Sequence, residues 1–514
     1  MFYPHSLANG LYASSQSRLR CHHMTNFTHP FCDIDGDKLR EECGVFGVIG
    51  GDKAAVTCAL GLHALQHRGQ EAVGITSFDG TEFFTRRGLG HVADNFATEE
   101  AIAELPGLMA VGHVRYSTTG GAGLRNVQPL YADLASGGFA VAHNGNISNA
   151  RKLRQELVEK GAIFQSTSDT EVIIHLVATS RYPTMLDKLV DALRLVEGAY
   201  ALIVETPRGM IGCRDPLGIR PLVMGKLGDA TVFASETVAL DVVGAEFVRQ
   251  VDPGEFIEVD FDGTLRTHRP FGEISPRPCI FEHVYFSRPD SIFNDRSVYE
   301  SRKNIGIELA KENPCEADLV VPVPDSGVPA AIGYSQQSGI PFELGIIRSH
   351  YVGRTFIQPS DGARHASVKR KHNANRLLVE GKRIVLIDDS IVRGTTSLKI
   401  VQMMRDAGAK EVHFRVASPP TGHGCYYGVD TPESSKLLAG RMDLAAMREF
   451  IQADSLAFVS IDGLYRAVGL KGRNNSCPQY CDACFTGDYP TSLTDLAAKK
   501  ADDAQLDLPV GKVA

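Results

Sequence analysis

The chain has 514 residues, of which 43% are hydrophobic and 22% are charged, as is typical of soluble globular proteins. The formal net charge of −8 does not indicate a nucleic-acid-binding surface, and no run of about 18 apolar residues indicates a membrane span. The eleven cysteines are scattered, and no secretory signal precedes them. They indicate thiols or metal ligands in a reducing compartment such as the cytoplasm, in a chain long enough for about two to four domains.

Residues 1–42 show little apolar periodicity and are rich in His, Ser, Arg and Asn. Met24 is a second candidate start. Arg18 and Arg20 would suit a transit peptide, whereas the acids from Asp33 onward argue against one in the second half. The segment is either a disordered extension or a leader that is removed, and the residues that follow favour removal.

An apolar strand begins abruptly at Cys43 and continues through Gly44–Val48. A lone cysteine in such a strand is by default a buried structural residue. If the leader is removed, however, Cys43 becomes the chain N-terminus. Its own α-amine, with an ordinary pKa of about 7.7–8.0, can then take the thiol proton. Base and nucleophile would share one residue.

Polar residues at the ends of predicted elements support the second interpretation. Arg115 ends one predicted strand, and Asp169 begins a predicted helix, where it could pair with a substrate ammonium group. Asn144 and Gly145 follow the apolar strand Phe139–Ala142 and offer an amide side chain and a glycine N–H, the pair that an oxyanion hole needs. Taken singly, each residue also has a structural explanation as a salt bridge, a turn or a helix cap.

Taken together with Leu65–Glu71 and Asp215–Leu222, these motifs resemble class II glutamine amidotransferases over about 43–259. The resemblance implies an α/β fold of the N-terminal-nucleophile type, a four-layer α/β/β/α sandwich. Predicted strands at Tyr200–Glu205, Leu222–Gly225 and Thr231–Ala234 agree with it.

The same resemblance implies the roles of the candidate residues. Cys43 would attack the glutamine side-chain amide. Arg115 and Asp169 would hold the glutamine carboxylate and amine, and Asn144 and Gly145 would form the oxyanion hole.

Residues 261–278 form a predicted crossover rich in Gly, Pro and Arg. We expect a glutaminase domain at 43–275, a second domain at 276–475 and a cysteine-bearing C-terminal segment with an Ala/Lys/Asp-rich tail at 476–514. The second domain alternates strands with helices: strands are predicted at Leu319–Val323 and Phe342–Ile347, and a helix at Ala330–Gly339. The basic segment Arg348–Arg376 is either a solvated loop or an active-site lid.

The stretch Arg383–Ser397 has a distinctive order of residues. Four apolar residues, Ile384–Ile387, run into Asp388 and Asp389, and a glycine turn then opens the predicted helix Thr396–Ala407. Ligands of open α/β sheets bind at the carboxyl ends of strands, and helix N-termini bind phosphate. The stretch resembles the PRPP-binding motif of type I phosphoribosyltransferases, which implies a Rossmann-like parallel sheet.

By this resemblance Ser326, Asp388 and Asp389 contact Mg²⁺ directly or through water, with the two acids near the ribose hydroxyls. The 5′-phosphate would be held by the residues of the turn and the helix N-terminus, which are Arg393, Gly394, Thr395, Thr396 and Ser397.

Cys481 and Cys484 have the spacing of a metal-ligand pair, and Cys279 and Cys425 could complete a set of four. The sequences around all four cysteines resemble the iron–sulfur subgroup of PRPP amidotransferases, in which four thiolates bind a [4Fe–4S] cluster. Zinc is the alternative metal. The cluster would have a structural role.

The combined resemblance to PRPP amidotransferases covers about 43–490 and includes the lid, through 351–359. It implies that glutamine, PRPP and water yield 5-phosphoribosylamine, glutamate and pyrophosphate at the entry to purine synthesis. It also implies a tetramer or dimer and inhibition by purine nucleotides.

Two other interpretations stay open. The chain could be another class II amidotransferase, such as a hexosamine-forming synthase, although the isomerase domain of such an enzyme lacks the Asp388–Thr396 motif. It could instead be a non-enzymatic PRPP sensor, although a sensor would not need Cys43 or the residues that hold glutamine.

Overall fold

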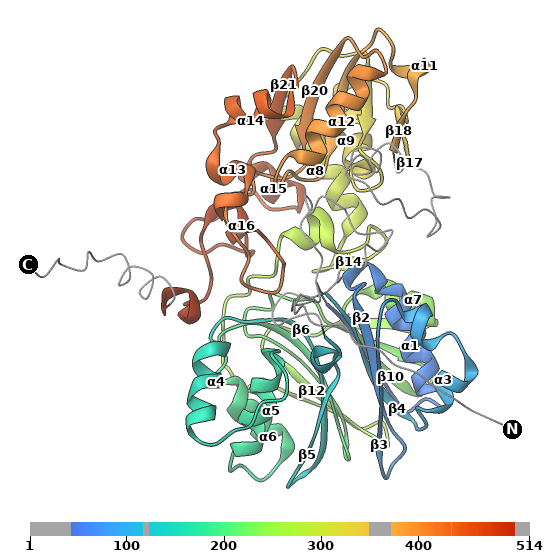
Figure 1. The fold of residues 1–514 in the computed structure, drawn as a ribbon, viewed down its shortest axis with the longest axis vertical. Helices are drawn as coiled ribbons and strands as arrows, with labels where there is room; N and C mark the ends of the chain where they lie inside the picture. Colours follow the sequence, from blue (N-terminus) through green and yellow to red (C-terminus); the bar gives the residue numbers. More distant parts are fainter. Residues whose placement is uncertain (1–42, 117–122, 349–371, 433, 499–514) are drawn as a thin grey trace, which may run out of the picture.

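The computed structural model describes residues 43–116, 123–348, 372–432 and 434–498. The predicted leader 1–42 and most of the predicted lid lie outside the described residues. The described chain forms two α/β parts, with the N-terminal part below and the second part above in Figure 1.

The N-terminal part contains two antiparallel sheets that pack face to face. The seven-stranded sheet has the order β11 (Glu246–Gln250), β9 (Val223–Leu227), β10 (Ala230–Ala234), β1 (Gly44–Ile49), β4 (Met109–Arg115), β2 (Ala72–Phe78) and β3 (Phe83–Leu89). The six-stranded sheet has the order β13 (Leu265–His268), β12 (Phe256–Asp260), β8 (Gly209–Arg214), β7 (Gly198–Thr206), β6 (Gly137–Ile147) and β5 (Leu130–Leu134).

Helices cover the outer face of each sheet, which confirms the predicted four-layer sandwich. The helices beside the first sheet are α1 (Ala54–Ala64), α2 (Val92–Phe96), α3 (Glu99–Ala103) and α7 (Thr237–Val243), and those beside the second are α4 (Ala150–Glu159), α5 (Thr170–Thr179) and α6 (Met185–Leu193). Strand β1 shows why its sequence is apolar throughout. Val45 and Ile49 face the other sheet, whereas Phe46 and Val48 pack in the core that contains α1, so both faces are buried.

The second part contains a parallel sheet with the order β16 (Leu319–Pro322), β19 (Arg383–Asp388), β20 (Glu411–Val416) and β21 (Ser455–Phe458). Its helices are α8 (Val298–Glu312), α9 (Val328–Ser338), α11 (Arg376–Val379), α12 (Thr395–Asp406), α13 (Leu438–Arg441), α14 (Leu444–Ile451), α15 (Ile461–Ala467) and α16 (Ala483–Thr486). The short pairs β14 (Ile292–Phe293) with β15 (Arg296–Ser297) and β17 (Ile346–Arg348) with β18 (His372–Ala374) are antiparallel. This parallel sheet confirms the predicted fold class.

Two local predictions are wrong in extent. Phe342 makes only an isolated bridge to Val320, and β17 begins at Ile346, so there is no continuous strand at Phe342–Ile347. A Cβ on the intervening Gly345 would lie 2.8 Å from the Val321 side chain, so the chain passes close to β16 there. The predicted crossover also contains β13, which pairs with β12 along the sheet edge.

Part of the expected tail packs against the N-terminal part. The Asp495 carboxylate accepts hydrogen bonds from the backbone N–H groups of Arg151 (2.7 Å) and Lys152 (3.1 Å) in the first turn of α4. The Thr494 hydroxyl donates to Glu197 at 2.7 Å. The Asp495 carboxylate thus binds N–H groups in the first turn of α4, which have no partner within the helix. The C-terminal segment therefore ties the second part to the first.

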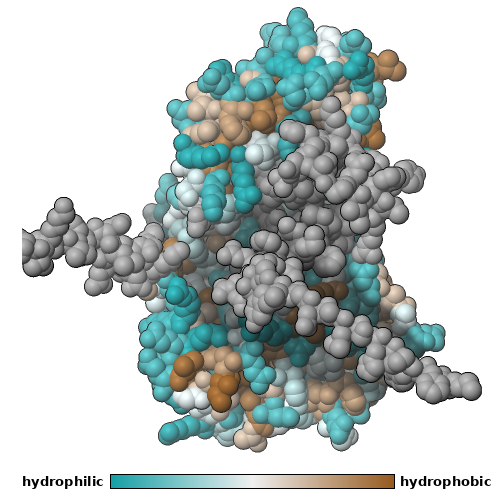
Figure 2. All heavy atoms as spheres, viewed as in Figure 1, coloured by the Kyte–Doolittle hydropathy of each residue, from teal (hydrophilic) through white to brown (hydrophobic). Residues whose placement is uncertain are grey.

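The visible face is mostly hydrophilic, with small separate hydrophobic patches on both parts (Figure 2). Among the described residues, no helix combines the length and the apolar character that a membrane crossing requires.

Glu205 is the one acid on β7 that faces the other sheet, on the same side of the strand as Ile203. It is fully buried, and neither carboxylate oxygen has a hydrogen-bond partner within the described residues. Burial raises the pKa of Glu205 well above its usual range, because a charged carboxylate is costly in an apolar core. The folded state therefore retains a proton that the unfolded state releases above about pH 4.5.

Glu205→Gln should stabilise the protein increasingly as the pH rises. The wild type loses about 1.4 kcal/mol of stability per pH unit above that point, until the buried group itself ionises, and the neutral amide avoids this loss. Urea unfolding at pH 5, 6 and 7 measures the difference, with exposed Glu246→Gln on β11 as the control. A gain that is equal at all three pH values would contradict the buried neutral carboxyl.

Candidate functional sites

The first candidate site lies where β1 begins and β4 ends. The two strands are antiparallel, and Gly44 pairs with Val114, so Cys43 lies beside Arg115. The Cys43 Sγ atom lies 3.6 Å from the carbonyl oxygen of Tyr116. Burial raises the pKa of the Cys43 thiol to about 11, Arg115 lowers it and Asp169 raises it. A thiol in this state needs a nearby base before it can act as a nucleophile.

The candidate oxyanion residues approach Cys43 from the other sheet. Asn144 is fully buried, and its Nδ2 atom lies 3.5 Å from the Ser235 hydroxyl. The same hydroxyl accepts a hydrogen bond from the Val45 backbone N–H at 2.9 Å, so Ser235 connects Asn144 to the strand that follows Cys43. The sequence placed Asn144 and Gly145 after a strand, but both lie within β6 and pair with β7.

Gly145 has a structural reason to be glycine. Its φ of +145° is rarely adopted by other residues, and a Cβ there would lie 2.0 Å from the carbonyl oxygen of Ala199 on β7. Neighbouring β7 therefore fixes the position of the Gly145 backbone.

Asp169 is placed by two backbone contacts. It caps α5 by accepting from the Thr170 N–H at 3.0 Å, and it accepts from the Ile147 N–H at 2.9 Å. Ile147 lies two residues beyond Gly145, so the same strand positions both candidates. The predicted residues Cys43, Arg115, Asn144, Gly145 and Asp169 thus come together at one end of the sandwich.

The second candidate site lies at the carboxyl ends of β16 and β19, which are parallel neighbours. Ser326 follows β16, and Asp388 and Asp389 end β19. A Cβ on Gly327 would lie 2.3 Å from the Ile387 carbonyl oxygen, so the serine turn packs directly against the acid-bearing strand. Carboxylate and hydroxyl oxygens at one sheet edge are a ligand set that suits Mg²⁺.

A turn and a helix N-terminus complete this site. Gly394 has a φ of +82° and precedes α12, and a Cβ there would lie 2.7 Å from the Leu438 side chain. The Thr395 hydroxyl is buried and makes no hydrogen bond to any residue that the structure describes. Thr396 and Ser397 continue the first turn of α12, and Arg393 precedes the glycine. The N-terminus of α12, with the buried Thr395 hydroxyl beside its N–H groups, can accommodate a phosphate.

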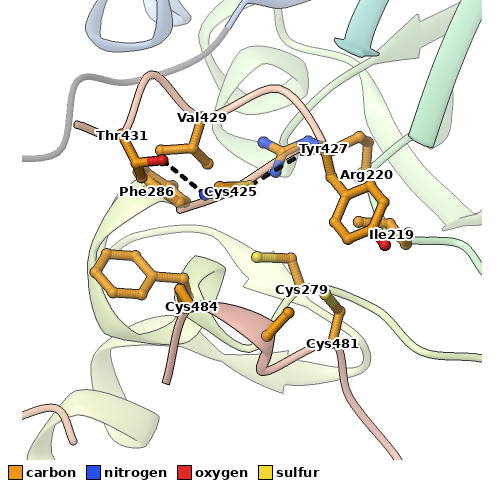
Figure 3. Close-up of a pocket in the computed structure, with 12 residues that line it drawn as sticks. Ile219, Arg220, Cys279, Phe286, Cys425, Tyr427, Val429, Thr431, Cys481 and Cys484 are labelled. Atoms are coloured by element: carbon orange, nitrogen blue, oxygen red, sulfur yellow. Dashed lines mark hydrogen bonds between the residues drawn. The ribbon is translucent and has the colours of Figure 1, made fainter. Parts of the chain in front are cut away.

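The four predicted cysteines line one buried cavity of about 20 Å³ (Figure 3). Cys279 and Cys481 face each other in a parallel bridge, Cys484 lies on α16, and Cys425 comes from the loop after β20. Burial raises the pKa of all four thiols, and the Tyr427 N–H lies 3.4 Å from the Cys425 Sγ atom.

The residues of this cavity fit an iron–sulfur cluster. A cluster binds one thiolate on each of four irons, so its ligands surround a cavity, and N–H···S hydrogen bonds tune it. No group of three or more His, Cys, Asp or Glu side chains within the described ranges is arranged to hold a single metal ion.

A buried ionic cluster lies between the two parts and was not expected from the sequence. Arg68 contacts Glu236 and donates to Glu282 at 2.5 Å, and Arg220 donates to the other oxygen of Glu282 at 2.9 Å. All four side chains are at most 2% exposed. Burial raises the pKa of Glu236, but Arg68 and His67 outweigh this effect and hold the pKa far below its usual range. Arg68 belongs to the Leu65–Glu71 motif, but nothing in that motif indicated its partners.

Known proteins match both parts of the chain. Residues 113–242 match the family model of a glutamine amidotransferase domain, and residues 298–425 match that of a phosphoribosyl transferase domain. An amidophosphoribosyltransferase of Rhizobium etli is 57% identical over 467 residues, which cover 90% of this chain and 94% of the relative. The chain belongs to the amidophosphoribosyltransferase family.

Other family members agree with this assignment. Chloroplastic amidophosphoribosyltransferase 1 of Arabidopsis thaliana is 49% identical, with 97% of this chain and 87% of the relative covered. The solved structure of glutamine PRPP amidotransferase from Bacillus subtilis, complexed with ADP and GMP, is similar with a TM-score of 0.83 and 47% identity. The similarity covers 88% of this chain and 98% of that one. The chain therefore has the activity of the family, a phosphoribosyltransferase with a glutamine amidotransferase domain, at the first step of purine biosynthesis.

Proposed function

We propose that Cys43 is the nucleophile of the glutaminase half-reaction, in a mature chain that begins at this residue. Its thiol proton passes to the free α-amine, and the sulfur attacks the glutamine amide carbon. Ammonia leaves as a thioester forms, and water then releases glutamate and restores the thiol. The placement of Cys43 where β1 begins, beside Arg115, supports this role, because burial raises the pKa of the thiol and Arg115 counteracts this by lowering it. A fully active chain that retains Glu42 would contradict it.

The neighbours of Cys43 would hold the substrate and its transition state. The Arg115 guanidinium pairs with the glutamine carboxylate and the Asp169 carboxylate with its ammonium group. The Asn144 side chain and the Gly145 N–H donate to the oxyanion that forms when the thiolate attacks. The contact of Asn144 with Ser235, which also binds β1, supports a fixed distance between oxyanion donors and nucleophile.

In the second half-reaction ammonia attacks C1 of PRPP and pyrophosphate leaves. Ser326, Asp388 and Asp389 would hold Mg²⁺, which offsets the negative charge of the departing pyrophosphate when it is bound. The two acids would also contact the ribose hydroxyls, and Arg393–Ser397 would hold the 5′-phosphate. The observation that carries this assignment is the buried Thr395 hydroxyl at the N-terminus of α12, which has no hydrogen-bond partner within the described residues.

Nucleotide regulation and assembly extend the proposal. The relative from Bacillus subtilis was solved with ADP and GMP, and a second structure with the same TM-score of 0.83 is described as the allosteric regulatory enzyme of purine biosynthesis. We propose that purine nucleotides inhibit this chain too, and that it forms a dimer or tetramer in a reducing compartment such as the cytoplasm. Inhibition assays with AMP, ADP and GMP, and the mass in solution, test these points.

The two half-reactions should be separable by substitution. Asn144→Ala should lower the kcat for glutamate release by about 100- to 1000-fold, because one oxyanion donor is lost. It should leave synthesis from PRPP and added ammonium intact. Asp388→Asn should do the reverse, abolishing ammonium-dependent synthesis while glutamate release without PRPP persists. Assays of glutamate and pyrophosphate measure both. If either variant loses both half-reactions equally while it stays folded, the assignment of two sites is wrong.

We further propose that Cys279, Cys425, Cys481 and Cys484 bind a [4Fe–4S] cluster with a structural role. Anaerobically purified protein should be brown, with broad visible absorbance and equal amounts of iron and sulfide. Cys481→Ser should remove the colour and the iron. Cys477→Ser should retain them, because this exposed cysteine lies four residues away and does not line the cavity. A colourless protein that contains zinc would contradict the proposal.

A further inference from the structure

A loop of the second domain packs directly on the candidate oxyanion strand. Gly428 lies in this loop, which we define as Gly424–Val429, and a Cβ on Gly428 would lie 3.0 Å from the Cα atom of Gly145. The Asn146 side-chain amide donates a hydrogen bond to the carbonyl oxygen of Tyr426 at 2.9 Å. Two successive residues of β6 therefore contact one loop from the other domain.

The contact places backbone atoms on both sides of Gly145. On one side a Cβ on Gly145 would meet the Ala199 carbonyl oxygen at 2.0 Å, and on the other side a Cβ on Gly428 would lie 3.0 to 3.1 Å from the C, Cα and O atoms of Gly145. Gly428 itself has a φ of +113°, so a side chain there would be both strained and obstructed. The Gly145 backbone is thus enclosed between β7 and the Gly424–Val429 loop.

The loop is itself firmly anchored. The Cys425 N–H donates to the Thr431 hydroxyl at 2.6 Å, and the Gly424 carbonyl accepts from the Tyr489 hydroxyl at 2.6 Å. The Tyr427 hydroxyl lies 3.0 Å from that of Thr491. These partners belong to the second domain and the C-terminal segment, so the position of the loop depends on how those parts are arranged.

We propose that the Gly424–Val429 loop is a positioning element of the glutaminase site: Gly428 and the Tyr426 carbonyl hold the Gly145 backbone where its N–H meets the developing oxyanion. This inference rests on the proposed role of Gly145. Oxyanion stabilisation depends on donors that are already in place, and a misplacement of about 1 Å costs about 100-fold in rate. The glutaminase domain would accordingly need the second domain for full activity, even in the absence of PRPP.

Gly428→Ala tests the proposal in the full-length protein. The methyl group should displace Gly145 and lower the kcat for glutamate release by about 10- to 100-fold, while the KM for glutamine changes little, because Arg115 and Asp169 are untouched. Synthesis from PRPP and added ammonium should remain at the wild-type rate. The rate at which iodoacetamide alkylates Cys43 should also stay at the wild-type value, since alkylation needs no oxyanion donor.

Gly80→Ala is the matched control. Gly80 has a similar φ of +102°, but a Cβ there would meet no atom of the described residues within 4 Å. It lies beyond the Phe78 end of β2, whereas the Ala72 end is the one beside Arg115. An alanine at this position is strained in the same way by the positive φ, and the variant should keep the wild-type kcat. Asn146→Asp is a second variant, in which a carboxylate faces the Tyr426 carbonyl, and it should lower kcat in the same way with no change at Gly428.

The outcomes distinguish the positioning role of the loop from the oxyanion hole itself. If Asn144→Ala is impaired but Gly428→Ala and Asn146→Asp both keep the wild-type kcat, the positioning role is wrong and the oxyanion hole stands. A parallel loss of ammonium-dependent synthesis in Gly428→Ala and Asn146→Asp would also overturn the positioning role, because it would show general disruption. If Asn144→Ala itself keeps full activity, the proposed oxyanion hole is wrong, and this inference fails with it.

Discussion

The arrangement of the two sites depends on one buried carboxylate, Glu282, at the junction of the domains. Two arginines of the glutaminase domain, Arg68 and Arg220, donate to it, and the Ser287 hydroxyl donates at 2.6 Å. A buried charge is costly to leave unpaired, so this carboxylate fixes the elements that bring its partners. Glu282 begins a single turn at Glu282–Phe286, three residues after Cys279. The same ion cluster thus sets the position of the first cavity cysteine.

The ion cluster reaches both functional regions through short links. Arg220 lines the cysteine cavity on one side (Figure 3). On the other side Arg68 contacts Glu236, and the preceding residue, Ser235, contacts both Asn144 and β1. Cavity, ion cluster and glutaminase site therefore form a continuous set of buried contacts. The Gly428 contact with Gly145 is a second, independent connection between the same regions.

Local patterns were sufficient to predict the elements that carry the candidate residues of each site. The apolar run before Asp388 and the glycine turn after it mark a strand end and a helix start, and the structure has both at the predicted place. The cysteines could be grouped by their surrounding sequences, and the structure places all four around one cavity. Such signals lie within a few residues of one another, where spacing and periodicity determine geometry.

Long-range contacts could not be predicted in this way. Arg68 and Glu282 are 214 residues apart, and the sequence around each residue does not indicate that the two will pair. Asn144 and Gly145 were expected to follow the strand Phe139–Ala142, but pairing with β7 keeps both residues within it. Edge strand β13 was missed for a similar reason, since its polar, half-exposed residues become a strand only through pairing with β12. Tertiary pairing overrides local preference at each of these positions.

The central claim is that the buried cluster around Glu282 keeps the two sites working as one enzyme. The ratio of glutamate to pyrophosphate released in the complete reaction tests this claim most directly, in the wild type and in folded Glu282→Gln. We predict a ratio of one for the wild type. For the variant we predict a ratio clearly above one, with both half-reactions retained, because glutamine is hydrolysed without transfer of its ammonia. An unchanged ratio of one in the variant would contradict the account.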